Sequence, residues 1–146
     1  MCLLIFLNSI CILYFYGLRN LLHKYIWYIG FIIYIIELFL YLLTSILNPG
    51  TPEKKYFLEN FDMEKNDLKN YRICGNCKLI MDLDKETEHC YDCNICVMGN
   101  DHHCPWTSKC VGYKNIYFFY GFITFFFILI IYLMFAVMTI AFNRDD

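Results

Sequence analysis

Three long apolar stretches stand out along this chain. Residues 2–18 and 116–142 contain no charged side chain, and residues 25–47 contain one, Glu37. As α-helices, residues 2–18, 25–47 and 116–142 would be about 25, 34 and 40 Å long, compared with about 30 Å for the hydrocarbon core of a bilayer. The two longer stretches can span a bilayer with some tilt, whereas residues 2–18 are marginal. The pattern predicts three transmembrane helices, of which the first two form a hairpin over residues 1–47.

Composition supports an α-helical polytopic membrane protein. Apolar residues make up 59% of the chain and charged residues 18%, whereas soluble domains have about 45–50% and 25%. An aromatic content of 20% argues against intrinsic disorder, and a net charge of −2 provides no basic surface for nucleic acid. A cleaved signal peptide is the alternative interpretation of residues 2–18, although no basic residue precedes this stretch.

The link between the second and third apolar stretches, residues 48–115, is predicted to face the cytosol. It carries nine Lys and Arg residues but also eleven acidic ones, so the charge signal is weak. Seven of the nine cysteines lie in this link. Because seven is an odd number, these thiols cannot all form disulfides with one another, and their clustering suits metal binding in a reducing compartment better. Residues 143–146 would then form a short tail on the opposite side.

The first part of the link, residues 48–72, is predicted to be a cytosolic linker. It opens with Asn48-Pro49-Gly50-Thr51-Pro52, in which proline prevents the helix from continuing and glycine allows a sharp turn. Residues 53–72 have mixed charge with apolar side chains at near-helical spacing, which fits either a short amphipathic segment or an irregular linker.

The second part, residues 73–115, carries the candidate chemistry. Its cysteines and histidines follow the pattern Cys74-x2-Cys77, then His89-Cys90-x2-Cys93-x2-Cys96, then Asp101-His102-His103-Cys104, then Cys110. Two cysteines separated by two residues place both thiolates on one tight turn, as a tetrahedral zinc ion requires. The segment has too few Leu, Ile and Val side chains to fold without a cross-link such as a bound metal ion. It is therefore predicted to be a loop-rich zinc module.

The number of potential ligands exceeds what two zinc sites need. Seven cysteines and three histidines give ten candidates, and two tetrahedral sites use eight. The count alone does not say which two remain, but a thiol beside an imidazole is the arrangement that nucleophilic catalysis needs. Because His102 and His103 are adjacent, they cannot easily face one metal together, and one could approach Cys104 while the other ligates.

These motifs resemble those of the DHHC-type protein S-acyltransferases, or palmitoyltransferases. The resemblance covers residues 48–119 and is tightest over residues 74–119. Besides the pattern above, it includes Pro105-Trp106 after the Asp-His-His-Cys, Cys110-Val111-Gly112, and Asn115-x3-Phe119. Such a combination is far more specific than a generic zinc-finger spacing.

The resemblance implies a role for each matching residue. One structural zinc ion would be bound by Cys74, Cys77, His89 and Cys96, and the other by Cys90, Cys93, His103 and Cys110. Cys104 would be the acylated nucleophile, His102 its base, and Asp101 the residue that orients His102. Residues 73–115 would thus be both the zinc-binding and the catalytic module.

The resemblance also implies an activity and a location. The chain is expected to transfer a long-chain acyl group from a fatty acyl-CoA, such as palmitoyl-CoA, through acyl-Cys104 to cysteines of membrane-associated proteins. Its partners would be acyl-CoA, those protein substrates and the lipid bilayer, with no nucleic acid. It would be an integral membrane protein of the Golgi, ER or plasma membrane, with the zinc module in the cytosol.

The sequence departs from the family pattern in two respects. The interval between Cys77 and His89 has eleven residues instead of the usual nine and is acidic, with no Arg-Pro-x-Arg element, so acyl-CoA contacts from this element are not expected. Family members also typically have a fourth transmembrane helix followed by Thr-Thr-x-Glu, whereas this sequence stops at Asp146, as expected of a shortened chain. The alternative function is a catalytically inactive, membrane-anchored zinc-binding interaction module.

Overall fold

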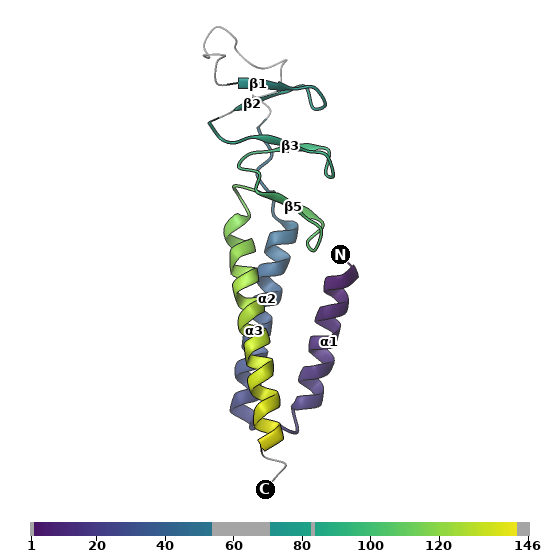
Figure 1. The fold of residues 1–146 in the computed structure, drawn as a ribbon, viewed down its shortest axis with the longest axis vertical. Coiled ribbons are helices and arrows are strands. Elements are labelled where there is room, and N and C mark those ends of the chain that lie inside the picture. Colours follow the sequence, from purple (N-terminus) through teal and green to yellow (C-terminus); the bar gives the residue numbers. More distant parts are fainter. Residues whose placement is uncertain (1, 54–70, 83, 143–146) are drawn as a thin grey trace. The chain divides into compact units, whose positions relative to one another are not determined.

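The computed structural model describes residues 2–53, 71–82 and 84–142. The chain divides into two compact units (Figure 1), which we call the helical unit, Met1–Thr44 with Phe118–Asp146, and the hairpin unit, Ser45–Tyr117. The residues of the predicted amphipathic segment from 54 to 70 lie outside the described part of the chain, as do residues 143–146.

Three α-helices follow the three apolar stretches. They are α1 (Cys2–Leu18), α2 (Lys24–Ile46) and α3 (Ile116–Phe142). Two of them, α2 with 23 residues and α3 with 27, are long and apolar enough to cross a bilayer. Helix α1, with 17 residues, is too short to be counted among the candidate membrane spans. Most side chains of α3 lie outside the protein core, as expected of a lipid-facing helix.

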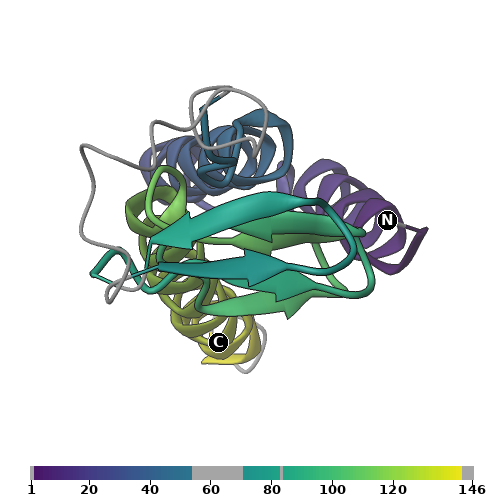
Figure 2. The same ribbon diagram turned by 90° about the horizontal axis from the view of Figure 1, so that it is seen from above.

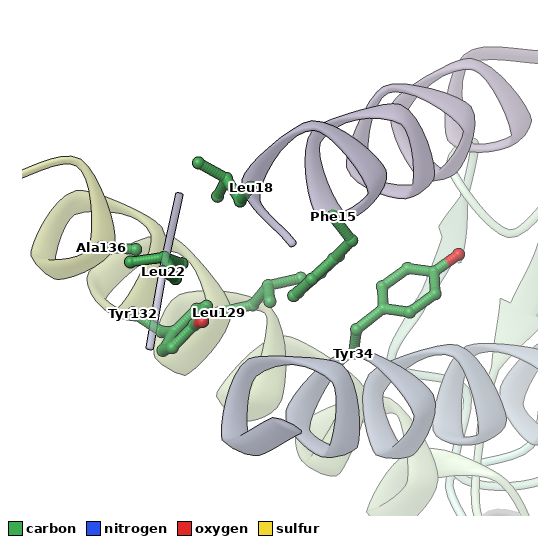
Figure 3. Packing of buried hydrophobic residues seen from close by; sticks show 7 residues of the cluster. All are labelled: Phe15, Leu18, Leu22, Tyr34, Leu129, Tyr132 and Ala136. Carbon is green, nitrogen blue, oxygen red and sulfur yellow. The ribbon is translucent and has the colours of Figure 1, made fainter. Parts of the chain in front are cut away.

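Aromatic side chains form much of the core of the helical unit, as Figure 3 shows. Phe15 of α1 stacks on Tyr132 of α3 with ring centroids 6.3 Å apart, and it also contacts Tyr34 of α2. The Tyr132 hydroxyl donates a hydrogen bond of 2.9 Å to the carbonyl oxygen of Ile26. Gly30 makes this contact possible, because a β-carbon at its position would collide with the Tyr132 ring. The core therefore joins all three helices.

Glu37 lies inside the helical unit. Its side chain is only 2% exposed, and its neighbours along α2 at the same helical face, Tyr34 and Tyr41, are also buried. An acidic side chain at bilayer depth is expected to face protein rather than lipid. The structure agrees with this expectation.

The described residues of the hairpin unit form three antiparallel two-stranded hairpins, which follow one another along the vertical axis of Figure 1 and overlap in the view from above in Figure 2. Each pairs strands that are consecutive in sequence, and in each the first strand ends at a cysteine. The hairpins are β1 (Tyr71–Cys74) with β2 (Leu79–Asp82), β3 (Glu88–Cys90) with β4 (Ile95–Val97), and β5 (His102–Cys104) with β6 (Lys109–Val111). Such short strands have little hydrophobic surface of their own, so the unit depends on further links between hairpins.

The segment that follows α2 is built into the hairpin unit. The side-chain oxygen of Asn48 accepts hydrogen bonds of 2.8 Å from the backbone N–H groups of Gly50 and Thr51, which forms a tight Asx turn. The Gly50 carbonyl then accepts a bond of 2.9 Å from the Met98 N–H group. The turn predicted from the Pro and Gly residues is therefore present, and it anchors the chain beside β4.

Gly112 is expected to be intolerant of any side chain. A β-carbon there would lie 2.7 Å from the Pro49 carbonyl oxygen and 2.6 Å from Val97, so backbone would have to shift. We expect Gly112→Ala to destabilise the hairpin unit by about 1–3 kcal/mol, as other overpacking changes do. Denaturant-induced zinc release from the full chain would measure this. Gly75→Ala is the matched control, because nothing lies within 4 Å of its β-carbon; equal effects of the two changes would contradict the prediction.

Candidate metal centres and nucleophile

The eight predicted metal ligands converge on two places in the hairpin unit. The groups are Cys74, Cys77, His89 and Cys96 in one cluster and Cys90, Cys93, His103 and Cys110 in the other, and within each cluster all ligand atoms lie within 4.8 Å of one another. These are the same two sets that the family resemblance implies. In each cluster two members are buried and two are half-buried.

The first cluster joins hairpin β1–β2 to hairpin β3–β4. The Nδ1 atom of His89 lies 3.5 Å from Cys74 Sγ, 3.3 Å from Cys77 Sγ and 3.7 Å from Cys96 Sγ. The other ring nitrogen, Nε2, lies 3.2 Å from the side-chain amide of Asn76. A metal on Nδ1 would leave the proton on Nε2, and the Asn76 amide would have to present its oxygen there to accept it.

The second cluster joins hairpin β3–β4 to hairpin β5–β6. His103 Nδ1 lies 3.7 Å from Cys90 Sγ, 3.2 Å from Cys93 Sγ and 3.9 Å from Cys110 Sγ. His103 and Cys110 are direct cross-strand partners, as are His89 and Cys96 in the first cluster. Both clusters therefore combine a cysteine turn from one hairpin with a cross-strand pair from the next.

The distances fit tetrahedral zinc. Zn–S bonds of about 2.3 Å and Zn–N bonds of about 2.05 Å at tetrahedral angles place sulfur and nitrogen about 3.6 Å apart. The six measured sulfur–nitrogen distances, from 3.2 to 3.9 Å, lie on either side of that value. Three thiols and an imidazole are also a donor set that zinc prefers. The two clusters are consistent with two zinc ions.

Electrostatics within the clusters also favour a cation. Burial raises the pKa of Cys96, and the neighbouring sulfurs of Cys74 and Cys77 raise it further. Burial and the sulfurs of Cys93 and Cys90 raise the pKa of Cys110 in the same way. In each cluster, therefore, ionisation of this last thiol is disfavoured beside the other two, and a divalent cation among them would favour it.

Cys104 belongs to neither cluster. It ends β5, its side chain is 3% exposed, and it is hydrogen-bonded to the side chain of His102. The Nδ1 atom of His102 lies 2.8 Å from Asp101 Oδ2. Because Asp101 accepts the Nδ1 proton, the other ring nitrogen is left for Cys104. The three predicted catalytic residues are thus arranged in series, as carboxylate, imidazole and thiol.

This arrangement favours an ionised thiol. Burial by itself raises the pKa of Cys104, but the Thr107 N–H group, the His102 side chain, the Thr107 hydroxyl and the Trp106 N–H group lower it, and the net pKa is below the usual value. Burial lowers the pKa of His102, but its hydrogen bonds to Asp101 and Cys104 outweigh this and raise it. The paired shifts are those of a thiolate beside an imidazolium.

Two residues near Cys104 were not predicted from the sequence. Thr107 is 4% exposed, and its hydroxyl lies 3.4 Å from the Cys104 carbonyl oxygen. Lys109 is the cross-strand partner of Cys104 and donates a hydrogen bond of 2.9 Å to the carbonyl oxygen of Ile46 at the end of α2. Threonine and lysine are common on protein surfaces, so only the spacing of Thr107 from Cys104 could have drawn attention to it.

A separate cavity in the hairpin unit is not part of this site. It has a volume of about 480 Å³ and an acidic lining that includes Glu53, Asp84 and Glu86. None of the predicted metal-binding or catalytic residues lines it. Part of the acidic interval after Cys77, from Asp84 to Glu86, therefore lines a cavity to which the thiol and imidazole groups do not contribute.

Comparison with known sequences identifies relatives of the chain. The sequence model of the family described as "DHHC palmitoyltransferase" matches residues 67–146, more than half of the chain. The match includes all eight residues of the two clusters as well as Asp101, His102 and Cys104.

Several curated proteins are similar over most of this chain. Palmitoyltransferase ZDHHC16A of Danio rerio is 31% identical over 125 residues, which cover 81% of this chain and 30% of that protein. Palmitoyltransferase PFA3 of Candida glabrata is 29% identical over 112 residues, covering 64% of this chain and 33% of the relative. The chain thus spans about a third of the length of these relatives.

Proposed function

This chain belongs to the DHHC palmitoyltransferase family, and we propose that it is a protein S-acyltransferase. It accepts a long-chain fatty acyl group, such as palmitoyl, from acyl-CoA on Cys104. It then passes that group to a cysteine of a membrane-associated protein. His102 is the acid and base of both steps, and Asp101 orients His102.

One observation carries this proposal: the hairpin unit holds one cysteine outside both metal clusters, and that cysteine has a carboxylate-oriented imidazole beside it. A module that only binds zinc has no use for such a group. An unliganded thiol with a lowered pKa and a neighbouring base is instead the arrangement of cysteine nucleophiles.

In the first step, the Cys104 thiolate attacks the thioester carbon of acyl-CoA. The bond between that carbon and the sulfur of CoA breaks, and CoA takes the proton from His102 as it leaves. Because one thioester replaces another, the step is close to balanced in free energy and needs no other energy source. Asp101 holds the charge and the tautomer of His102 during the transfer.

In the second step, a substrate cysteine attacks the acyl group on Cys104. Neutral His102 accepts the proton of the substrate thiol, and Cys104 leaves as a thiolate. The N–H groups of Thr107 and Trp106 stabilise that leaving thiolate, since they already donate to the Cys104 sulfur. The same groups therefore assist both formation and breakdown of the acyl-enzyme.

In this proposal the two clusters would bind structural rather than catalytic zinc ions. The three thiols and one imidazole of each cluster would fill a tetrahedral zinc site and leave no open position for substrate. The role of both sites is to fix hairpins that bury too little apolar surface to fold alone. The two clusters would thereby position Cys104 without a metal contact to the reacting atoms.

The location follows from the chemistry of the substrate. Each buried CH2 group of an acyl chain contributes about 0.8 kcal/mol, so a long acyl group stays in the bilayer while its thioester lies at the interface. We propose that α1, α2 and α3 all span the membrane and that the hairpin unit faces the cytosol, where acyl-CoA and reduced thiols are found. The membrane is the Golgi, the ER or the plasma membrane.

The test is covalent labelling of the full chain with a fatty acyl-CoA probe. We expect a hydroxylamine-sensitive label that mass spectrometry places on Cys104 and that Cys104→Ser abolishes. Cys11→Ser is the matched control, because it removes a thiol from α1 and should keep the label. Two bound zinc ions without any label, or a label that persists in Cys104→Ser, would favour the inactive zinc-binding interaction module instead.

A further inference from the structure

The three hairpins of the hairpin unit have the same type of turn. In each, a cysteine ends the first strand and pairs with the residue five positions later: Cys74 with Leu79, Cys90 with Ile95, and Cys104 with Lys109. In each, the residue four positions after that cysteine has a positive φ angle: 51° at Lys78, 53° at Asn94 and 53° at Ser108. We call this turn, from the cysteine to the positive-φ residue, the knuckle.

In all three knuckles, backbone N–H groups donate hydrogen bonds to the sulfur of the first cysteine. The N–H group three residues later points at the sulfur, with distances of 3.4 Å from Cys77 N to Cys74 Sγ and from Cys93 N to Cys90 Sγ. In the third knuckle the Thr107 and Trp106 N–H groups donate to Cys104 Sγ in the same way. Cys104 therefore has the backbone surroundings that hold a metal-binding sulfur in the other two hairpins.

The clusters also follow one rule of assembly. Each combines both cysteines of one knuckle with the cross-strand His and Cys pair of the next hairpin, His89 with Cys96 or His103 with Cys110. The first hairpin has apolar Ile73 and Ile80 at the position of that pair. Hairpin β5–β6 supplies its pair to the second cluster, so its own knuckle is the one left over.

The third knuckle departs from the others at one ligand position. Where the first two have their second cysteine, Cys77 and Cys93, the third has Thr107. The Thr107 side chain is buried at 4% exposure, and its hydroxyl is hydrogen-bonded within the knuckle. We propose that β5–β6 is a third zinc knuckle from which Thr107 excludes the metal, and that Thr107 is the residue that keeps the Cys104 sulfur free.

A second thiol at position 107 would complete a metal site. The knuckle geometry would place it beside Cys104 Sγ, as Cys77 lies beside Cys74, and His102 already lies within hydrogen-bonding reach of Cys104. Two thiolates and one imidazole with a water molecule form a known type of zinc coordination. The same change would remove the nucleophile, because a zinc-bound thiolate is no longer available to attack a thioester.

The experiment measures zinc in the full-length Thr107→Cys variant, purified in excess phosphine reductant so that no disulfide can form. We expect zinc to rise from two to three ions per chain and acyl-CoA labelling to be lost. Adding Cys104→Ser to this variant should return the count to two. Ser108→Cys is the matched control, since it places a thiol one residue outside the ligand position and should keep two ions and the label.

This inference rests on the proposed zinc ligation and on Cys104 as nucleophile, but its failure is distinguishable from theirs. A wild-type protein without two zinc ions contradicts the ligation, and one without a label contradicts the activity. Two ions in wild type and still two in Thr107→Cys overturn the role of Thr107. If Thr107→Cys holds fewer than two ions, Thr107→His takes its place, where a third ion supports the proposal and two ions overturn it.

Discussion

Replacing Cys90 by alanine is expected to remove one zinc ion and to lower acyl-CoA labelling of Cys104 by at least about 100-fold. Cys90 is a buried member of the cluster that contains His103 and Cys110, and these two residues lie on the hairpin that carries Cys104. Structural zinc contributes about 10–16 kcal/mol to the folding of small zinc modules, which exceeds the stability of most domains. Even the loss of a residue that only hydrogen-bonds to a metal ligand typically lowers metal affinity or activity 10–100-fold.

Cys74→Ala is the informative comparison for this prediction. It also removes one buried ligand, but from the cluster between the first and second hairpins, one hairpin farther from Cys104. We expect one zinc ion to be lost and labelling to fall less than in Cys90→Ala. Zinc content and labelling would be measured on the same preparations. Full labelling by Cys90→Ala with one zinc ion would show that the second cluster does not position Cys104.

The helices could be predicted from the sequence almost to the residue. Helices α1 and α3 occupy the expected residues 2–18 and 116–142, and α2 (Lys24–Ile46) begins and ends one residue before the expected 25–47. Long uncharged stretches leave the chain few alternatives in a bilayer, because every backbone group must be satisfied within the helix. Lys24 can join the helix because lysine is a good helix former and its side chain is exposed.

The grouping of ligands could not be obtained from spacing alone. Spacing identified Cys74 with Cys77 and Cys90 with Cys93 as pairs on tight turns, but each cluster takes its other two ligands from the next hairpin. Which hairpins stack is a property of the folded unit. The family resemblance supplied the grouping, and the structure brings the same residues together.

Residues of unremarkable type escaped prediction for a different reason. Thr107 matters because it is buried beside Cys104. The family motif includes Asn115 but predicts no role for it: the residue is fully buried, its Oδ1 atom accepts a hydrogen bond of 2.8 Å from the Gly112 N–H group, and its Nδ2 atom donates one of 3.0 Å to the Cys110 carbonyl oxygen. Neither threonine nor asparagine signals such a role by its chemistry. Their importance depends on burial, which is decided by packing.

Replacing Asp101 by asparagine is expected to slow acyl-enzyme formation by about 10²–10⁴-fold while both zinc ions remain bound. Asp101 Oδ2 lies 2.8 Å from His102 Nδ1 and is not among the cluster residues. The side-chain amide that Asp101→Asn introduces can donate a hydrogen bond to Nδ1, which places the ring proton on Nε2. The Nε2 atom can then no longer act as a base toward Cys104. Single-turnover labelling with acyl-CoA and zinc analysis would measure the two effects separately.

The pH profile separates this role from a merely structural one. In the wild type, the pKa of Cys104 is lowered and that of His102 is raised, so the thiolate persists below the usual thiol pKa of about 8.5 and labelling should continue at lower pH. Without the Asp101 carboxylate, the imidazolium loses its partner, the pKa of His102 falls and that of Cys104 rises. The acid limb of the labelling rate should therefore move to higher pH in Asp101→Asn. Asp92→Asn removes the same charge from an exposed position of the second knuckle and should leave rate and profile unchanged; the same shift in both variants would mean that only the net charge matters.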